Sequence, residues 1–162
     1  MAGGGLQLDL ASDDGTRTED IHRALIVRQP WAGMIASGTK RWEIRGRSTA
    51  VRGRIAIAAA GTGTIIGVCT LSEVVGPLAP DAYRDAWQLF GAGLRPDGPP
   101  PYPRTYAWVL ADARPILPPV GYLHPAGAVI WVRLTHDVES QIQAALRQPP
   151  AGASAGQPRD GA

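Results

Sequence analysis

The apolar residues of this chain fall into short runs that predict strands separated by brief helices. Residues 24–27 form an apolar run that ends at Arg28-Gln29-Pro30, which is typical of a buried strand. Polar and apolar positions alternate over residues 41–45, which predicts a second strand with Trp42 and Ile44 facing the core. By the same patterns we expect further strands at 54–60, 65–75, 106–110 and 128–134.

Short helices are predicted in the segments between these strands. Pro30 suits the first position of a short helix, and Gly38 is placed to end that helix in the left-handed conformation. Aromatic residues recur at i, i+4 and i+7 over 81–90, which predicts a second helix, and a third is expected to start with Asp137 as N-cap. Mostly antiparallel strands with short helices between them indicate a small α+β, barrel-like domain.

The two ends of the chain differ in composition from its middle. Residues 1–20 are rich in glycine and aspartate and carry five acids against one arginine, whereas residues 148–162 are dense in proline, glycine and alanine. We therefore expect a disordered acidic head, one folded domain over residues 21–147 and a disordered tail. A chain of 162 residues is well suited to a single domain.

Composition narrows the class of protein. No apolar run approaches the roughly 20 residues that span a bilayer, and the first residues lack the basic and apolar regions of a secretion signal. We therefore expect a cytoplasmic protein with no membrane partner. A single cysteine, Cys69, and three scattered histidines predict no disulfide, no metal site and no cofactor.

Positive charge is concentrated in the first third of the predicted domain. Between Arg23 and Arg54 the chain carries eight lysines and arginines against one acid, Glu43. Such clustering attracts phosphate groups with an affinity that depends on salt. Taken alone, this feature fits a solvated basic face equally well.

One motif within this basic stretch has a specific resemblance. Gly38, Lys40, Glu43 and Arg45 form a G-x-K-x-x-E-x-R pattern that follows Gln29-Pro30-Trp31 at a short helical distance. Together with RGRIAIAAA, IIGVCTLSEVV, YAWVL and GAVIWVRL, this pattern resembles the ASCH domain, a member of the PUA-like β-barrel superfamily, over most of residues 24–134. The resemblance implies a PUA-like β-barrel of five or six mostly antiparallel strands with short helices, and a cleft where the first helix meets the sheet. It also implies binding of RNA or single nucleotides, although some family members hydrolyse acylated cytidine or cleave RNA.

We expect this cleft to be basic and to bind nucleic acid, in particular RNA or single strands, or a modified nucleotide. Lys40 and Arg45 would meet phosphate or a base carbonyl, Glu43 would accept from a base amino group, and Trp31 would stack on a base. The candidate binding residues are Gln29, Trp31, Ser37, Thr39, Lys40, Arg41, Glu43, Arg45, Arg47 and Arg52. Structural roles stay open, because Lys40 also complements a helix dipole and Glu43 also suits an ion pair that holds the strand.

The alternative is an amidohydrolase that acts on acylated cytidine nucleosides, or a ribonuclease, with Lys40 and Glu43 as catalytic residues. Relatives with the first activity use a lysine at the position of Lys40, a threonine in place of Glu43 and a glutamate after the fourth strand. Only the lysine carries over, since residues 79–90 offer Asp81 and Asp85 but no glutamate. No histidine has an obvious partner for ribonuclease chemistry. Binding is therefore favoured, and a protein-interaction module without a nucleotide ligand is the third hypothesis.

Overall fold

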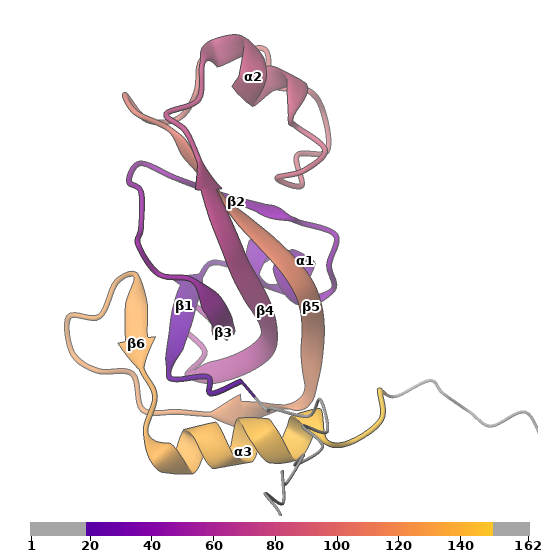
Figure 1. The fold of residues 1–162 in the computed structure, drawn as a ribbon, viewed down its shortest axis with the longest axis vertical. Helices are drawn as coiled ribbons and strands as arrows, with labels where there is room; N and C mark the ends of the chain where they lie inside the picture. Colours follow the sequence, from indigo (N-terminus) through magenta and orange to yellow (C-terminus); the bar gives the residue numbers. More distant parts are fainter. Residues whose placement is uncertain (1–18, 151–162) are drawn as a thin grey trace, which may run out of the picture.

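A computed structural model describes residues 19–150 of the chain. Six strands form one sheet in the order β2-β5-β4-β3-β1-β6, which curls into a half barrel with three short helices (Figure 1). The strands are β1 (Arg23–Val27), β2 (Trp42–Arg45), β3 (Gly53–Ala59), β4 (Thr64–Val75), β5 (Tyr106–Gly121) and β6 (Trp131–Arg133), and the helices are α1 (Trp31–Ala36), α2 (Pro80–Asp85) and α3 (His136–Leu146). Only β1 and β3 pair in parallel among these strands. The predicted α+β barrel-like fold is confirmed.

The predicted domain boundaries are only partly covered by the described residues. Most of the acidic head, residues 1–20, and most of the tail, residues 148–162, lie outside them. The disorder of both ends therefore stays a prediction. No helix within residues 19–150 is long and apolar enough to cross a membrane.

The central strands bury side chains on both faces of the sheet. Alternate residues enter opposite faces of a strand, so Ala24 and Ala56 join one hydrophobic cluster, whereas Leu25 and Ile57 join the other. Helix α3 packs on the first cluster and α1 on the second. In Figure 1, α3 lies across the bottom of the view and α1 lies partly hidden behind the sheet. Burial on both faces explains why the sequence of these strands is apolar almost throughout.

Helix α1 lies unusually close to β4. A Cβ atom at Gly67 would lie 2.7 Å from the Cβ of Ala36, a distance that real side chains do not tolerate. The absence of a side chain at Gly67 therefore allows α1 to pack directly on the strand. This contact fixes the C-terminal end of α1 against β4.

The prediction that Trp42 and Ile44 face the core is wrong. In the register of β2 with β5, Glu43 lies opposite Trp108, which is buried in the core, whereas Trp42 lies opposite Val109. Glu43 is consequently buried, and Trp42 and Ile44 are half-buried. Alternation defines two faces of a strand, but it does not decide which face turns inward when charged partners can satisfy a buried carboxylate.

Several element boundaries also differ from the predictions. The helix expected over 81–90 is helical only to Asp85 and continues as turns, and the strand expected over 128–134 is reduced to Trp131–Arg133. Thr135, not Asp137, caps α3, because the Thr135 hydroxyl accepts from the backbone N–H of Val138. Strand β5 continues to Gly121 through prolines, which its second half tolerates because β2 pairs only with its first residues.

Candidate functional site

A cleft of about 1070 Å³ opens beside the carboxyl ends of β1 and β3. These two strands run in parallel, so their carboxyl ends lie next to each other, and Val27-Arg28 and Ala60-Gly61 there line the cleft. Trp31, at the start of α1, and β2 residues 43–45 contribute further lining. The remaining walls come from the turn at 90–93, the loop at 101–102 and the loop at 124–129.

Three charged side chains meet inside this cleft. The Lys40 Nζ lies 3.3 Å from Oε2 of Glu43, and the Arg45 Nε donates to Oε1 of Glu43 over 3.0 Å. Glu43 and Arg45 share one face of β2 because they are two residues apart, and Lys40 lies just before the strand. The carboxylate is therefore held between two cations.

Lys40 is buried and has no proton to offer a ligand. Its side chain is 5% exposed, and besides Glu43 its Nζ donates to the carbonyls of Trp42, at 2.7 Å, and Phe90, at 2.9 Å. An ammonium group has three protons, so all of its donors are used. Burial lowers the pKa of Lys40 below its ordinary value, and the Glu43 carboxylate opposes this shift. Lys40 acts as a tether that ties β2 to the turn at residues 90–93.

Arg45 is also held in place by contacts within the protein. Its Nη2 donates to the carbonyl of Ile26 over 3.0 Å, and its guanidinium lies 5.6 Å from the ring centroid of Trp108. Trp108 in turn stacks on Trp131 with ring centroids 5.7 Å apart, and its Nε1 donates to the carbonyl of Arg47. This packing fixes the orientation of the Arg45 side chain, and with it that of the Glu43 carboxylate.

The Glu43 carboxylate retains unused acceptor capacity. A carboxylate accepts about four hydrogen bonds, two on each oxygen. Lys40 uses one acceptor position on Oε2, and Arg45 uses one on Oε1. The Glu43 side chain is 11% exposed, and it lines the cleft. A ligand in the cleft therefore meets a fixed acceptor with about one free lone pair on each oxygen.

The rim of the cleft carries aromatic and cationic groups that are free to meet a ligand. Trp31 and Tyr102 line the cleft and remain 46% and 43% exposed. Arg28 also lines it, and its guanidinium makes no hydrogen bond or ion pair to any of residues 19–150. Gln29 lies between Arg28 and Trp31 in the sequence. Its Oε1 accepts from the Gly33 N–H, which supports the first turn of α1.

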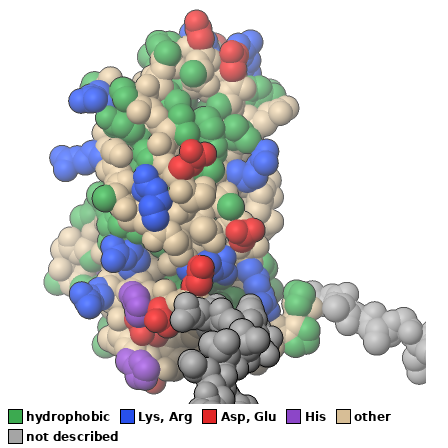
Figure 2. Space-filling model, viewed as in Figure 1, with side chains coloured by type: hydrophobic (Ala, Val, Ile, Leu, Met, Phe, Trp, Pro, Cys, Tyr) green, Lys and Arg blue, Asp and Glu red, His purple; other side chains and the backbone are tan. Residues whose placement is uncertain are grey.

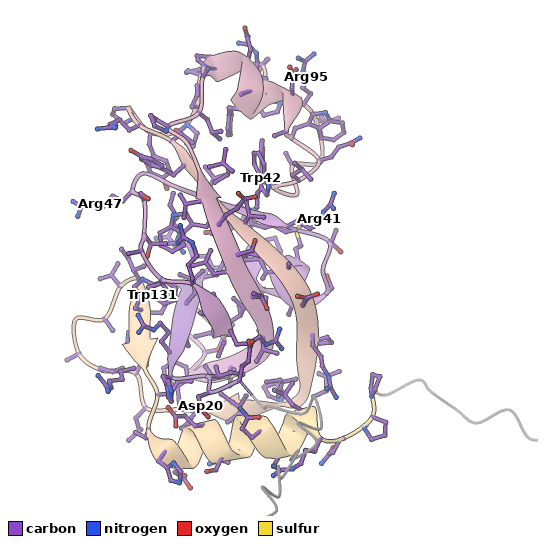
Figure 3. The ribbon with its side chains drawn as sticks, in the orientation of Figure 1. Asp20, Arg41, Trp42, Arg47, Arg95 and Trp131 are labelled. Atoms are coloured by element: carbon purple, nitrogen blue, oxygen red, sulfur yellow. The ribbon has the colours of Figure 1, made fainter. Side chains whose placement is uncertain are left out.

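The ten predicted site residues do not all reach the cleft. Trp31, Lys40, Glu43 and Arg45 line it, and Gln29 supports it. Ser37, Thr39, Arg41, Arg47 and Arg52 are not among its lining residues. The hydroxyls of Ser37 and Thr39 bond to each other, and Arg52 donates to backbone carbonyls in its own loop. Figure 3 places Arg41 and Arg47 on opposite sides of the molecule.

The face drawn in Figure 2 carries no continuous patch of positive charge among the described residues. On the face drawn in Figure 2, lysine and arginine side chains are scattered among polar and apolar groups. The sequence clusters these cations along the chain, but the sheet sends successive side chains to opposite faces. The charge next to the cleft comes from its own lining residues Arg28, Lys40 and Arg45.

Sequence reasoning missed some of the residues that line the cleft. Arg28 was available as the first residue after a predicted buried strand, and Tyr102 as the aromatic residue of a proline-rich loop. His124 also lines the cleft and bonds to Tyr122 and to the carbonyl of Ala128. His22 also has a partner that the sequence does not make obvious, because its Nδ1 lies 2.8 Å from Oε1 of Glu139 on α3.

The part of the chain that the structure describes offers no cluster of three or more His, Cys, Asp or Glu side chains that could hold a metal ion. Glu43 is the one carboxylate among the cleft-lining residues of that part. Asp81 and Asp85 of α2, the acids that the sequence offered for catalysis, instead pair with Arg84 and Arg95 at the surface.

The chain was compared with known proteins. The family model of the ASCH domain matches residues 25–120. A crystal structure of an ASCH protein from Zymomonas mobilis is similar with a TM-score of 0.54 and 22% sequence identity, over 76% of this chain and 94% of that one. A serine-to-alanine mutant of the same bacterial protein gives a TM-score of 0.51 and 22% identity, over 78% and 96% of the two chains. A search of curated proteins found no match.

Proposed function

Since this chain belongs to the ASCH domain family, we propose that its cleft binds a base and phosphate of single-stranded nucleic acid, in particular RNA, or a modified nucleotide. RNA-binding and hydrolase roles have been suggested for this PUA-like family. One observation carries the proposal: a single cleft is lined by the exposed Trp31, by the fixed Glu43 carboxylate and by Arg28, whose guanidinium has no partner within residues 19–150.

Each of these groups suits one part of a nucleotide. Stacking of a base on an exposed aromatic ring contributes about 1–3 kcal/mol to the binding free energy, whichever base it is. The Arg28 guanidinium suits a phosphate, because its planar donors match phosphate oxygens in pairs. A volume of about 1070 Å³ is at the upper end of the range for small-molecule pockets, which supports a ligand of nucleotide size or larger.

Fluorescence anisotropy of a labelled single-stranded RNA tests this proposal. We expect Trp31→Ala to weaken binding by roughly tenfold through the loss of stacking. Arg28→Ala should weaken binding and reduce its dependence on salt, because one phosphate contact is lost. The matched control is Arg41→Ala, which removes the same charge from an exposed position outside the cleft and should leave the affinity almost unchanged.

Two outcomes would refute the cleft as the binding site. In the first, the wild-type protein fails to bind RNA even at low salt. In the second, Arg28→Ala and Arg41→Ala weaken binding equally, which would assign the affinity to overall charge and not to the cleft.

Hydrolysis of acylated cytidine has less support from the same geometry. Lys40 already donates its three protons within the protein, and Glu43 is already shared by Lys40 and Arg45. Neither group is poised to move a proton without breaking contacts that hold the cleft together. We therefore expect the wild-type protein either not to hydrolyse acetylated cytidine or to hydrolyse it at a rate that Lys40→Met leaves unchanged.

A further inference from the structure

The arrangement of Glu43 has a consequence for which base the cleft accepts. Lys40 occupies one lone pair of Oε2, and Arg45 occupies one lone pair of Oε1. One lone pair remains on each oxygen, so the carboxylate offers two acceptor positions side by side and no donor. A ligand that satisfies both must present two adjacent N–H groups.

Among the common bases, guanine alone has that edge when neutral. Its ring N1–H and its exocyclic amino group lie next to each other, and both are donors. Adenine and cytosine place a ring acceptor beside their amino group, and uracil places its single ring N–H between two carbonyls. These acceptors would face the carboxylate oxygens, which is unfavourable for a buried, charged group.

We therefore infer that the cleft selects guanine, with the Glu43 carboxylate accepting from both donors of the Watson–Crick edge. This inference rests on the proposed function, because it needs a base stacked in the cleft. Discrimination requires that the carboxylate does not move. Arg45 holds it from one side and is itself fixed by Ile26 and Trp108, while Lys40 is fixed on the other side.

The charge of the cleft argues against another ligand with two parallel N–H groups. The guanidinium of an arginine side chain has the same donor pair, but it is a cation. Lys40, Glu43 and Arg45 together carry a net positive charge, and Arg28 adds another on the rim. A neutral base attached to a phosphate is favoured in such surroundings, whereas a cation is repelled.

Heptameric single-stranded RNA probes with one variable central base in a uridine background test guanine selection. Guanine and hypoxanthine differ only in the exocyclic amino group, so the comparison isolates one of the two expected hydrogen bonds. We expect the guanine probe to bind about tenfold more tightly than the inosine probe, and the adenine and uracil probes to bind more weakly than inosine. Adding N-acetylarginine amide should not displace the guanine probe at concentrations where guanosine monophosphate does.

The possible results separate this inference from the function on which it rests. Equal, measurable affinity for the guanine and inosine probes would overturn guanine selection and leave the cleft as a binding site. Absence of binding to every probe would overturn both. Displacement by the arginine amide at the concentrations effective for guanosine monophosphate would also overturn the assignment to guanine.

Two variants locate the effect. Glu43→Gln replaces one acceptor with a donor, so the preference for guanine over inosine should fall below twofold, whereas Trp31→Ala should weaken all probes by a similar factor. If Glu43→Gln does not fold, the ratio of guanine to inosine affinity in the wild-type protein still decides the question. A guanine preference that survives in folded Glu43→Gln would overturn the role of this carboxylate.

Discussion

The tether made by Lys40 leads to a quantitative prediction about stability. Lys40→Met keeps an unbranched side chain of similar length but removes two hydrogen bonds to backbone carbonyls and the ion pair with Glu43. The carbonyls of Trp42 and Phe90 then lose their Lys40 donor, and Glu43 retains only Arg45. Removing one partner of a buried ion pair typically costs about 3–5 kcal/mol of unfolding free energy.

The lower end of that range applies to this site. Burial disfavours the charged form of Lys40, as its lowered pKa indicates, so the wild-type protein already bears part of the desolvation cost that methionine avoids. Arg45 also continues to neutralise the carboxylate. We therefore expect Lys40→Met to lower the unfolding free energy by about 3 kcal/mol, a large fraction of the roughly 5–15 kcal/mol typical of a domain.

Urea unfolding followed by tryptophan fluorescence measures this change. With a slope of about 2 kcal/mol per molar urea, the midpoint should fall by about 1.5 M. Arg41→Met is the matched control, because Arg41 is the next residue and is exposed, and its midpoint should stay close to that of the wild type. A loss of unfolding free energy below about 1 kcal/mol for Lys40→Met would refute the tether and would mean that Lys40 is available to bind a ligand.

Two further predictions concern the packing beneath the cleft. Gly67→Ala should lower the unfolding free energy by about 1–3 kcal/mol because the new Cβ collides with Ala36. The control Gly121→Ala in β5 should be nearly neutral, because nothing lies within 4 Å of its new Cβ. Equal losses for the two variants in urea unfolding would contradict the close approach of α1 to β4. Burial raises the pKa of Cys69 from 9.0 to about 12, so the unfolded chain releases this proton first and stability falls as the pH rises from about 9 to 12. Between pH 8 and pH 10 the wild type should lose about 1.4 kcal/mol more than Cys69→Ala, and parallel pH profiles of the two proteins would refute this.

The central part of the fold could be predicted from sequence because both faces of its strands are apolar. Residues 24–27 and 54–60 were predicted as strands and form β1 and β3 within one residue at each end. Their assignment as strands does not depend on which face turns inward, since both faces bury apolar side chains. Helix α1 was equally predictable, because a proline precedes it and Gly38 ends it with a φ of +82°.

The site was less predictable because pairing between distant segments determines it. The inward orientation of Glu43 depends on its register with Trp108, and the burial of Lys40 depends on the carbonyl of Phe90, fifty residues away. Neither partner is visible in a local pattern. The second half of β5 was missed for a similar reason, because its prolines argue against a strand unless one edge is left unpaired.

These contacts change what the charges in the G-x-K-x-x-E-x-R motif do in this chain. Lysine and arginine in a basic stretch suggest phosphate binding, but here both are used to hold one carboxylate. If Lys40 were the phosphate contact, binding would require its bonds to the carbonyls of Trp42 or Phe90 to break, at a cost of roughly 1–3 kcal/mol for each buried acceptor left without its donor. Arg28 can contact a phosphate without any such cost. In the proposed binding mode, Arg28 at the rim therefore supplies the attraction for phosphate, and Glu43 at the centre supplies the choice of base.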